Sequence, residues 1–307
     1  MRTQFVIGSR GSQLALAQAH LIQEQLLQQT PGIEVRIEII KTTGDVSREP
    51  LSIIGGQGVF TKELEDALLN ERIDLAVHSL KDLPTITPHG LAISAICKRD
   101  DPRDALVLPM KSKAGASLQE LASGAVAGTS SPRRLAQLKS LRPDLVFKDV
   151  RGNVDTRLRK LDDGEYDALI LACAGLRRLH LDNRITAALP TEQMLPAVGQ
   201  GALAIETRAA DADSIELTVR LDHKFSRVAC AAERALLRQL GGGCQLPIAA
   251  HSVVRDKRVR LDGLIAATDG TTIVRERVVG GLDEAEELGR LLAETLLENG
   301  GRELLGR

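Results

Sequence analysis

The sequence contains no tryptophan, one tyrosine and four phenylalanines among its 307 residues. Proteins that bind single-stranded nucleic acid usually stack the bases on several aromatic side chains, so this scarcity argues against a nucleic-acid module. The formal net charge of −1 excludes a general basic field that would attract nucleic acid or an anionic membrane. Any anion site must therefore come from a local concentration of arginine and lysine.

Cysteine is also scarce, and the four cysteines are far apart: Cys97, Cys173, Cys230 and Cys244. No C-x-x-C pair or nearby histidine gives them the spacing of zinc ligands, so we expect no metal site and reduced thiols. Residues 1–8 lack the apolar segment of a signal peptide, and no apolar run reaches the roughly 20 residues of a membrane helix. We therefore expect a cytoplasmic protein that binds neither membrane nor nucleic acid.

The chain is too long for one ordinary hydrophobic core, so two or three domains are expected. Apolar runs and helical spacing alternate along the first part of the chain, with strands predicted at 5–7, 33–39 and 73–77 and helices at 14–27 and 60–69. A second alternating unit begins near Asp104, with strands predicted at 126–128, 145–150 and 168–171 and a helix at 154–161. This alternation predicts α/β layers with parallel strands.

The last third of the chain has a different pattern. A helix is predicted at 225–240, followed by strands at 248–254, 259–266 and 272–279 and a helix at 283–297. This order is typical of a small α+β domain. The strand-like run at 202–207 could return to the first unit, and its residues alone leave that placement open.

Arginines recur where a predicted strand passes into a turn or helix: Arg10, Arg133, Arg134, Arg151, Arg157 and Arg178. A cation at a helix N-terminus opposes the helix dipole by roughly 0.3–1 kcal/mol when exposed. The pair after Ser131-Pro132, an N-cap followed by a first-turn proline, is therefore reasonable only if an anion lies there too. A single arginine is better explained as solvated surface, but the repeated placement favours a polyanion site beyond the strand ends.

Two further motifs carry possible chemistry. Asp82 follows a predicted strand in the run HSLKDLP at 78–84 and is either a turn residue or a carboxylate that moves protons. His78 in the same run is equally ambiguous. Cys244 follows three glycines at 241–243, which leave one flank of the thiol open for a large partner, although such a thiol could be incidental.

Seven stretches together resemble one family, that of porphobilinogen deaminase (hydroxymethylbilane synthase). They are GSRGSQLA at 8–15, FTKELE at 60–65, HSLKDLP at 78–84, GTSSPRR at 128–134, RGNVDTRL at 151–158, GQGA at 199–202 and GGGCQLP at 241–247. The family often carries lysines in the loop before the second motif, whereas residues 53–58 here read IIGGQG.

The resemblance implies a three-domain fold. Two α/β domains similar to type II periplasmic binding proteins would surround a cleft, and a small α+β domain would carry the cysteine loop. The implied boundaries are 1–98 with 200–219 for the first domain, 103–195 for the second and 223–307 for the third. The strand at 202–207 would then belong to the first domain, and the protein would be a monomer.

The resemblance also implies an activity. The family is a transferase of tetrapyrrole and heme biosynthesis that joins four porphobilinogen molecules head to tail, releases ammonia and frees hydroxymethylbilane by hydrolysis. A dipyrromethane cofactor, linked by a thioether to the cysteine that is Cys244 here, would prime the chain. The competing hypothesis is a non-enzymatic protein that binds a carboxylate or oxyanion in a similar cleft.

By the same resemblance, Asp82 would be the catalytic acid, with Lys81 beside it. The other implied residues would bind the acetate and propionate groups of the cofactor and substrate: Arg10, Ser12, Ser79, Thr129, Ser130, Ser131, Arg133, Arg134, Arg151, Gly152, Arg157, Gly175, Arg178 and Gln200.

Overall fold

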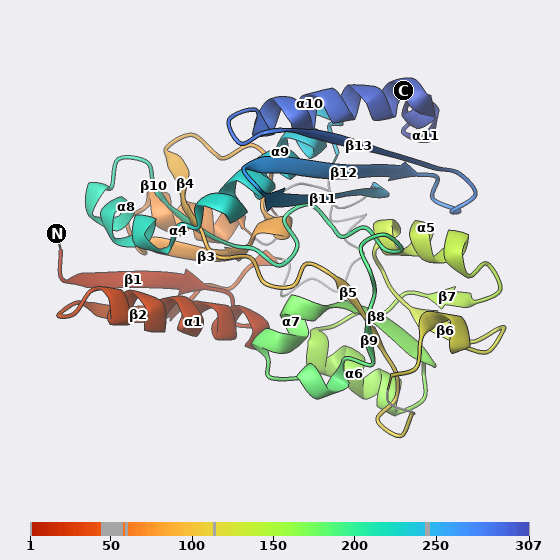
Figure 1. Ribbon diagram of the computed structural model, residues 1–307. Coiled ribbons are helices and arrows are strands. Elements are labelled where there is room, and N and C mark those ends of the chain that lie inside the picture. Colours follow the sequence, from red (N-terminus) through yellow and green to blue (C-terminus); the bar gives the residue numbers. More distant parts are fainter. Residues whose placement is uncertain (1, 44–57, 59–60, 113–114, 243–245, 307) are drawn as a thin grey trace. The chain divides into compact units, whose positions relative to one another are not determined.

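The computed structural model in Figure 1 describes residues 2–43, 58, 61–112, 115–242 and 246–306. Cys244 and most of the 53–58 loop lie outside these described residues. The chain divides into two compact units, Met1–Arg99 with Ala202–Arg227 and Asp100–Gly201 with Val228–Arg307. None of the described helices combines the length and the hydropathy needed to cross a lipid bilayer.

The first unit is built on a five-stranded sheet. Its order is β2 (Glu34–Ile39), β1 (Gln4–Ser9), β3 (Leu75–Ser79), β10 (Leu203–Arg208) and β4 (Leu91–Ile96). β1 runs parallel to β2 and β3, whereas β10 runs antiparallel to β3 and β4. Its helices are α1 (Gln13–Gln29), α4 (Lys62–Leu69) and α8 (Ala212–Thr218). Phe5 and Ile7 of β1 pack with Ile22 and Leu26 of α1 in one core.

The second unit contains a sheet with the same arrangement. Its order is β7 (Val146–Lys148), β6 (Val126–Gly128), β8 (Ala168–Ala172), β5 (Asp104–Val107) and β9 (Ala187–Ala188). β6 is parallel to β7 and β8, and β5 is antiparallel to β8 and β9. The helices α5 (Pro132–Leu141), α6 (Val154–Asp162) and α7 (Cys173–Arg178) follow β6, β7 and β8 in turn.

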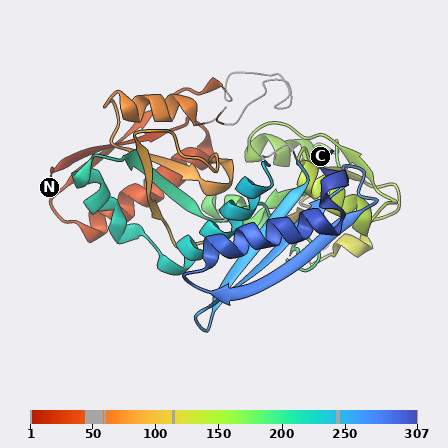
Figure 2. The ribbon, with the colours of Figure 1, turned by 90° about the horizontal axis from the view of Figure 1, so that it is seen from above.

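The second unit also holds an antiparallel sheet of β11 (Ile248–Arg255), β12 (Arg258–Ala266) and β13 (Ile273–Gly281). Helix α10 (Ala285–Leu296) lies along this sheet, as Figures 1 and 2 show, and the short α11 (Arg302–Leu304) follows it. Leu236 of α9 (Lys224–Gln239), Leu261 of β12 and Leu292 of α10 share one buried cluster.

The predicted fold class is confirmed, with two α/β sheets of one topology and an α+β region at the C-terminal end. The predicted parallel pairing is confirmed for β1 with β2 and β3 and for β6 with β7 and β8, whereas β10 and β5 each return antiparallel into their sheet. The run at 202–207 joins the first sheet as β10, the alternative that the resemblance favoured. Strands β4, β5 and β9 and helices α7, α8 and α11 had no predicted counterpart. The three domain boundaries and the cleft remain predictions.

Candidate functional site

In the first unit, two predicted groups of site residues follow neighbouring parallel strands. β1 ends at Ser9 and β3 ends at Ser79, and the register pairs Gly8 with Ala76. Arg10 and Ser12 therefore leave the same edge of the sheet as the turn after β3. The carboxyl edge of parallel strands is where α/β proteins bind ligands, so the structure brings these residues to a common edge.

Local contacts fix this edge. Ser12 caps α1, because its hydroxyl accepts a hydrogen bond from the amide of Ala15 at 3.3 Å. Buried Gln18 of α1 donates to the Ser79 hydroxyl at 2.9 Å and joins the end of β3 to the helix. Ser12 and Ser79 thus have structural contacts in addition to their predicted binding roles.

Asp82 lies in a single helical turn, η1 (Leu80–Asp82), directly after β3. Leu80 is fully buried, and its amide donates to the carbonyl of Ala202 at 3.0 Å. The Leu83 amide closes the turn by donating to the carbonyl of Leu80 at 3.2 Å. These contacts hold the backbone while the Asp82 side chain is exposed and Lys81 is half-buried, a placement that suits a carboxylate acting on a bound molecule.

His78 lies on the buried side of the same strand. Its Nε2 is 3.1 Å from a carboxylate oxygen of Glu206 on β10, and both side chains are buried. Glu65 of α4 interacts electrostatically with both groups, and burial raises the pKa of its carboxyl. This setting favours the structural interpretation of His78 over a catalytic one.

In the second unit, three strand ends carry predicted residues. Thr129, Ser130 and Ser131 follow β6, Arg151 and Gly152 follow β7, and Gly175 and Arg178 lie on α7 after β8. β6 is parallel to both neighbours, so these turns share one edge of the sheet. The Ser131 hydroxyl accepts from the amide of Arg134, which confirms the predicted N-cap of α5.

The small side chains at this edge also hold the turns together. The Ser130 hydroxyl donates to the carbonyl of Val150 at 2.8 Å, and the Thr129 amide donates to the carbonyl of Lys148 at 3.0 Å. Gly152 has a φ of 106°, a left-handed conformation that glycine adopts without strain. The two hydrogen bonds link the turn after β6 to the end of β7 and to the chain that follows it.

Arg133 and Arg134 both bind the buried carboxylate of Asp104 at the start of β5. The shortest nitrogen-to-oxygen distance is 2.7 Å for each pair. Gln200 donates to the same carboxylate at 2.9 Å. Burial would raise the pKa of Asp104, but the two guanidinium groups outweigh it and lower that pKa strongly. The anion that two arginines at a helix start require is therefore partly supplied by the chain itself.

Two other predicted arginines differ in their surroundings. Burial, and then repulsion by Arg134, lowers the pKa of Arg157 to about 10, while its Nε donates to the carbonyl of Gly152 at 2.8 Å. Arg178 donates to Asp100 and, at 2.7 Å, to the carbonyl of Gly201. A guanidinium whose pKa is lowered is disfavoured in its charged form, and an anionic ligand would remove that penalty.

The remaining cysteines are buried, at Cys97, Cys173 and Cys230. Burial raises the pKa of Cys173 to about 11, which makes its thiolate rare at neutral pH. Their burial is typical of cysteines that serve as small apolar core residues. The prediction for Cys244 falls outside the described residues.

Sequence reasoning missed two acids at this edge, Asp100 and Asp104. Asp104 opens the apolar run DALV at 104–107, and it is fully buried. A carboxylate is almost never fully buried unless it is paired. An acid at the start of an apolar run was thus a usable sign of a buried cation partner.

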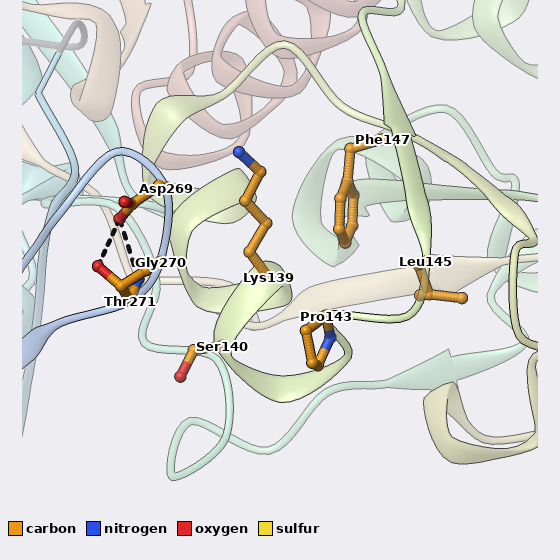
Figure 3. A pocket seen from close by; sticks show the side chains of 8 residues that line it. All are labelled: Lys139, Ser140, Pro143, Leu145, Phe147, Asp269, Gly270 and Thr271. Atoms are coloured by element: carbon orange, nitrogen blue, oxygen red, sulfur yellow. Dashed lines mark hydrogen bonds between the residues drawn. The ribbon is translucent and has the colours of Figure 1, made fainter.

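A pocket of about 420 Å³ lies at the other end of α5 and is lined by Lys139, Ser140, Pro143, Leu145, Phe147, Asp269, Gly270 and Thr271. Figure 3 shows Asp269 accepting two hydrogen bonds from Thr271 in the turn between β12 and β13. Gly270 has a φ of 76°, and a Cβ there would lie 2.5 Å from the carbonyl oxygen of Ala136. None of the predicted site residues lines this pocket, which is a packing feature between α5 and that turn.

Two family models match the chain. One, described as porphobilinogen deaminase, dipyromethane cofactor binding domain, matches residues 5–216, and the other, porphobilinogen deaminase, C-terminal domain, matches residues 228–298.

Curated relatives match over nearly the full length. Porphobilinogen deaminase from Desulforudis audaxviator is 51% identical over 308 residues, covering 100% of this chain and 98% of the relative. The protein of that name from Chlorobium luteolum is 48% identical and covers 99% and 98%, and the one from Nostoc sp. is 50% identical and covers 97% and 93%.

Among solved structures, the second substrate binding domain of a putative amino acid ABC transporter from Streptococcus pneumoniae matches with a TM-score of 0.44 at 14% identity. That match covers 77% of this chain and 94% of the transporter domain.

Proposed function

Because the chain belongs to the porphobilinogen deaminase family, we propose that Asp82 is its catalytic acid and that Cys244 carries its cofactor. The protein is an enzyme of tetrapyrrole biosynthesis that condenses porphobilinogen into hydroxymethylbilane on a dipyrromethane cofactor. The alternative of a non-enzymatic binding protein is not retained, because the relatives are enzymes over the full length of the chain.

The observation that supports a carboxylate-binding role for the arginines is the positive charge at the edge of the second sheet. Arg134 and Arg157 repel one another there, and Arg157 is charged despite its burial. Each pyrrole of this reaction bears an acetate and a propionate. Guanidinium groups bind carboxylates through two parallel hydrogen bonds, so this edge suits the side chains of a pyrrole chain.

The residues present fit a dipyrromethane, which bears four carboxylates. The Nε of Arg133 is buried without an acceptor among the described residues, so the cluster retains a donor. When bound, the cofactor supplies the terminal pyrrole carbon to which each new unit is joined. We propose that Arg133, Arg134, Arg151, Arg157 and Arg178 hold its carboxylates and those of the growing chain.

We propose the following chemistry for the first unit. The exposed carboxyl of Asp82 donates a proton to the amino group of porphobilinogen as the carbon–nitrogen bond breaks and ammonia leaves. As a carboxylate, it then stabilises the positive charge that develops on the pyrrole. Lys81, together with Arg10 and Ser12 at the same strand edge, would bind an acetate or propionate of that pyrrole.

The direct test is the mass and product of the full-length protein. We expect protein from a host that makes porphobilinogen to carry the added mass of two linked pyrrole units, located on the peptide with Cys244. Added porphobilinogen should yield ammonia and hydroxymethylbilane. A protein of unmodified mass that consumes porphobilinogen would contradict the Cys244 assignment, and one that consumes none would contradict the activity.

The Arg157→Gln variant should bind porphobilinogen more weakly. Hydrogen bonds to charged groups are each worth about 1.5–3 kcal/mol, so KM should rise about tenfold or more and the fraction of cofactor-loaded protein should fall. Arg290→Gln is the matched control, because Arg290 lies on α10 and pairs with the exposed Glu287. Equal kinetics in the two variants would remove Arg157 from the carboxylate site.

A further inference from the structure

Asp104 is a fully buried carboxylate on which three predicted ligand-binding side chains converge. Its Oδ1 accepts from both Arg133 and Arg134 and from Gln200, and its Oδ2 accepts from Arg133. The side chains of Arg133 and Arg134 are themselves only 5% and 9% exposed. The whole cluster is therefore removed from water, where charge interactions are strong.

The charges of the cluster do not cancel. Asp104 is ionised and faces two guanidinium groups, and the nearby Arg157 adds a third that repels Arg134. Three cations against one carboxylate leave two positive charges. One pyrrole unit, with its acetate and propionate, brings two negative charges.

Asp104 also restrains the orientation of the two arginines. A guanidinium is a rigid plane with five N–H donors. Asp104 holds one edge of each plane, and carbonyl groups hold another, Leu195 for Arg133 at 2.8 Å and Ile170 for Arg134 at 3.0 Å. The planes are therefore fixed before a ligand arrives, which lowers the entropic cost of binding.

We propose that Asp104 is a positioning residue of the carboxylate site, one that fixes Arg133 and Arg134 and sets the net charge that the pyrrole chain meets. This inference rests on the proposed function of the arginines. Asp104 touches neither substrate nor cofactor and acts through its two partners.

The first test is Asp104→Asn in the full-length protein, which keeps the shape of the side chain and removes its charge. We expect KM for porphobilinogen to rise at least tenfold and the cofactor-loaded fraction, measured by intact mass, to fall at least threefold. The kcat of the loaded fraction should stay within threefold of the wild-type value.

Asp101→Asn is the matched control. Asp101 is also largely buried and pairs with two arginines, Arg103 and Arg177. Neither arginine belongs to the predicted site. KM within twofold of wild type in the Asp104→Asn protein, or the same rise in KM in the Asp101→Asn protein, would overturn the proposal.

A double variant covers the case in which Asp104→Asn does not fold. Arg133→Gln combined with Asp104→Asn restores the charge balance of the three groups and should fold. If Asp104 positions Arg134, the double variant will have a KM at least fivefold above that of Arg133→Gln alone. The double variant carries one more positive charge than Arg133→Gln, so a KM equal to or below that of Arg133→Gln would show that Asp104 does not position Arg134, and the proposal would fail.

Failure of this inference is distinguishable from failure of the proposed function. If the wild-type protein carries the pyrrole mass and makes hydroxymethylbilane while the Asp104 variants match their controls, only the positioning role is lost. If the Arg157→Gln variant also has the KM of the wild-type protein, the carboxylate site itself is misplaced. Asp104 then has no arginines of that site to position.

Discussion

The Asp82→Asn variant is expected to keep its dipyrromethane and lose at least about 100-fold in turnover, since a positioned acid or base contributes typically 10²–10⁴-fold to rate. Asparagine keeps the size and hydrogen-bonding shape of the side chain, but it cannot donate a proton to the leaving amine or carry a charge opposite the developing cation. Turnover is measured as ammonia or hydroxymethylbilane released from porphobilinogen, and loading is measured by intact mass.

Asp66→Asn is the matched control for this experiment, because Asp66 is an exposed acid on α4 of the same unit. It should turn over at the wild-type rate. Asp82→Glu retains a carboxyl group at a shifted position and should recover part of the lost activity. A near-normal rate in Asp82→Asn would remove the residue from the mechanism and return it to its alternative role as a turn residue.

Local signals in the sequence predicted most helices and strands well. Ser131-Pro132 gave the start of α5 because capping and the fixed φ of proline depend only on adjacent residues. The strand predicted at 126–128 is β6, and the helix predicted from 154 begins there as α6. By contrast, the strand predicted at 73–77 lies at Leu75–Ser79. The apolar run begins at Ile73, which is buried in the core but precedes the strand, so the prediction began two residues early.

The direction of β10 and β5 could not be read from the sequence. Each strand is an apolar run of ordinary composition, and its antiparallel pairing depends on where the chain re-enters the sheet. The common order of the two five-stranded sheets was equally hidden, since no repeat of the sequence accompanies it. Backbone topology can recur while side chains diverge, because hydrophobic pattern rather than residue identity specifies a strand.

In the candidate site, too, local features could be predicted from the sequence and tertiary contacts could not. The sequence indicated that Arg133 and Arg134 need an anion at the start of their helix. It did not indicate that part of that anion is Asp104, which lies 29 residues before Arg133 and meets it only through the pairing of β5 with β8. The number of positive charges left for a ligand therefore depends on tertiary structure.

The Cys244→Ser variant is expected to carry no pyrrole mass and to make no hydroxymethylbilane. Thioether formation joins the cysteine sulfur to the methylene carbon of a porphobilinogen-derived unit, breaks the carbon–nitrogen bond and passes the thiol proton to the departing ammonia. A serine hydroxyl is a far weaker nucleophile at neutral pH. Without the tether, no primer is held from which the chain can grow.

Cys97→Ser is the matched control, since Cys97 lies in the buried cluster of the first unit. Its hydroxyl will cost some stability in an apolar setting, visible as a lower Tm, but the protein should still carry two pyrrole units. The two variants separate the tether from general effects of thiol loss. If Cys244→Ser still gained the mass of two pyrroles, another residue would be the attachment point, and peptide mapping of the modified protein would identify it.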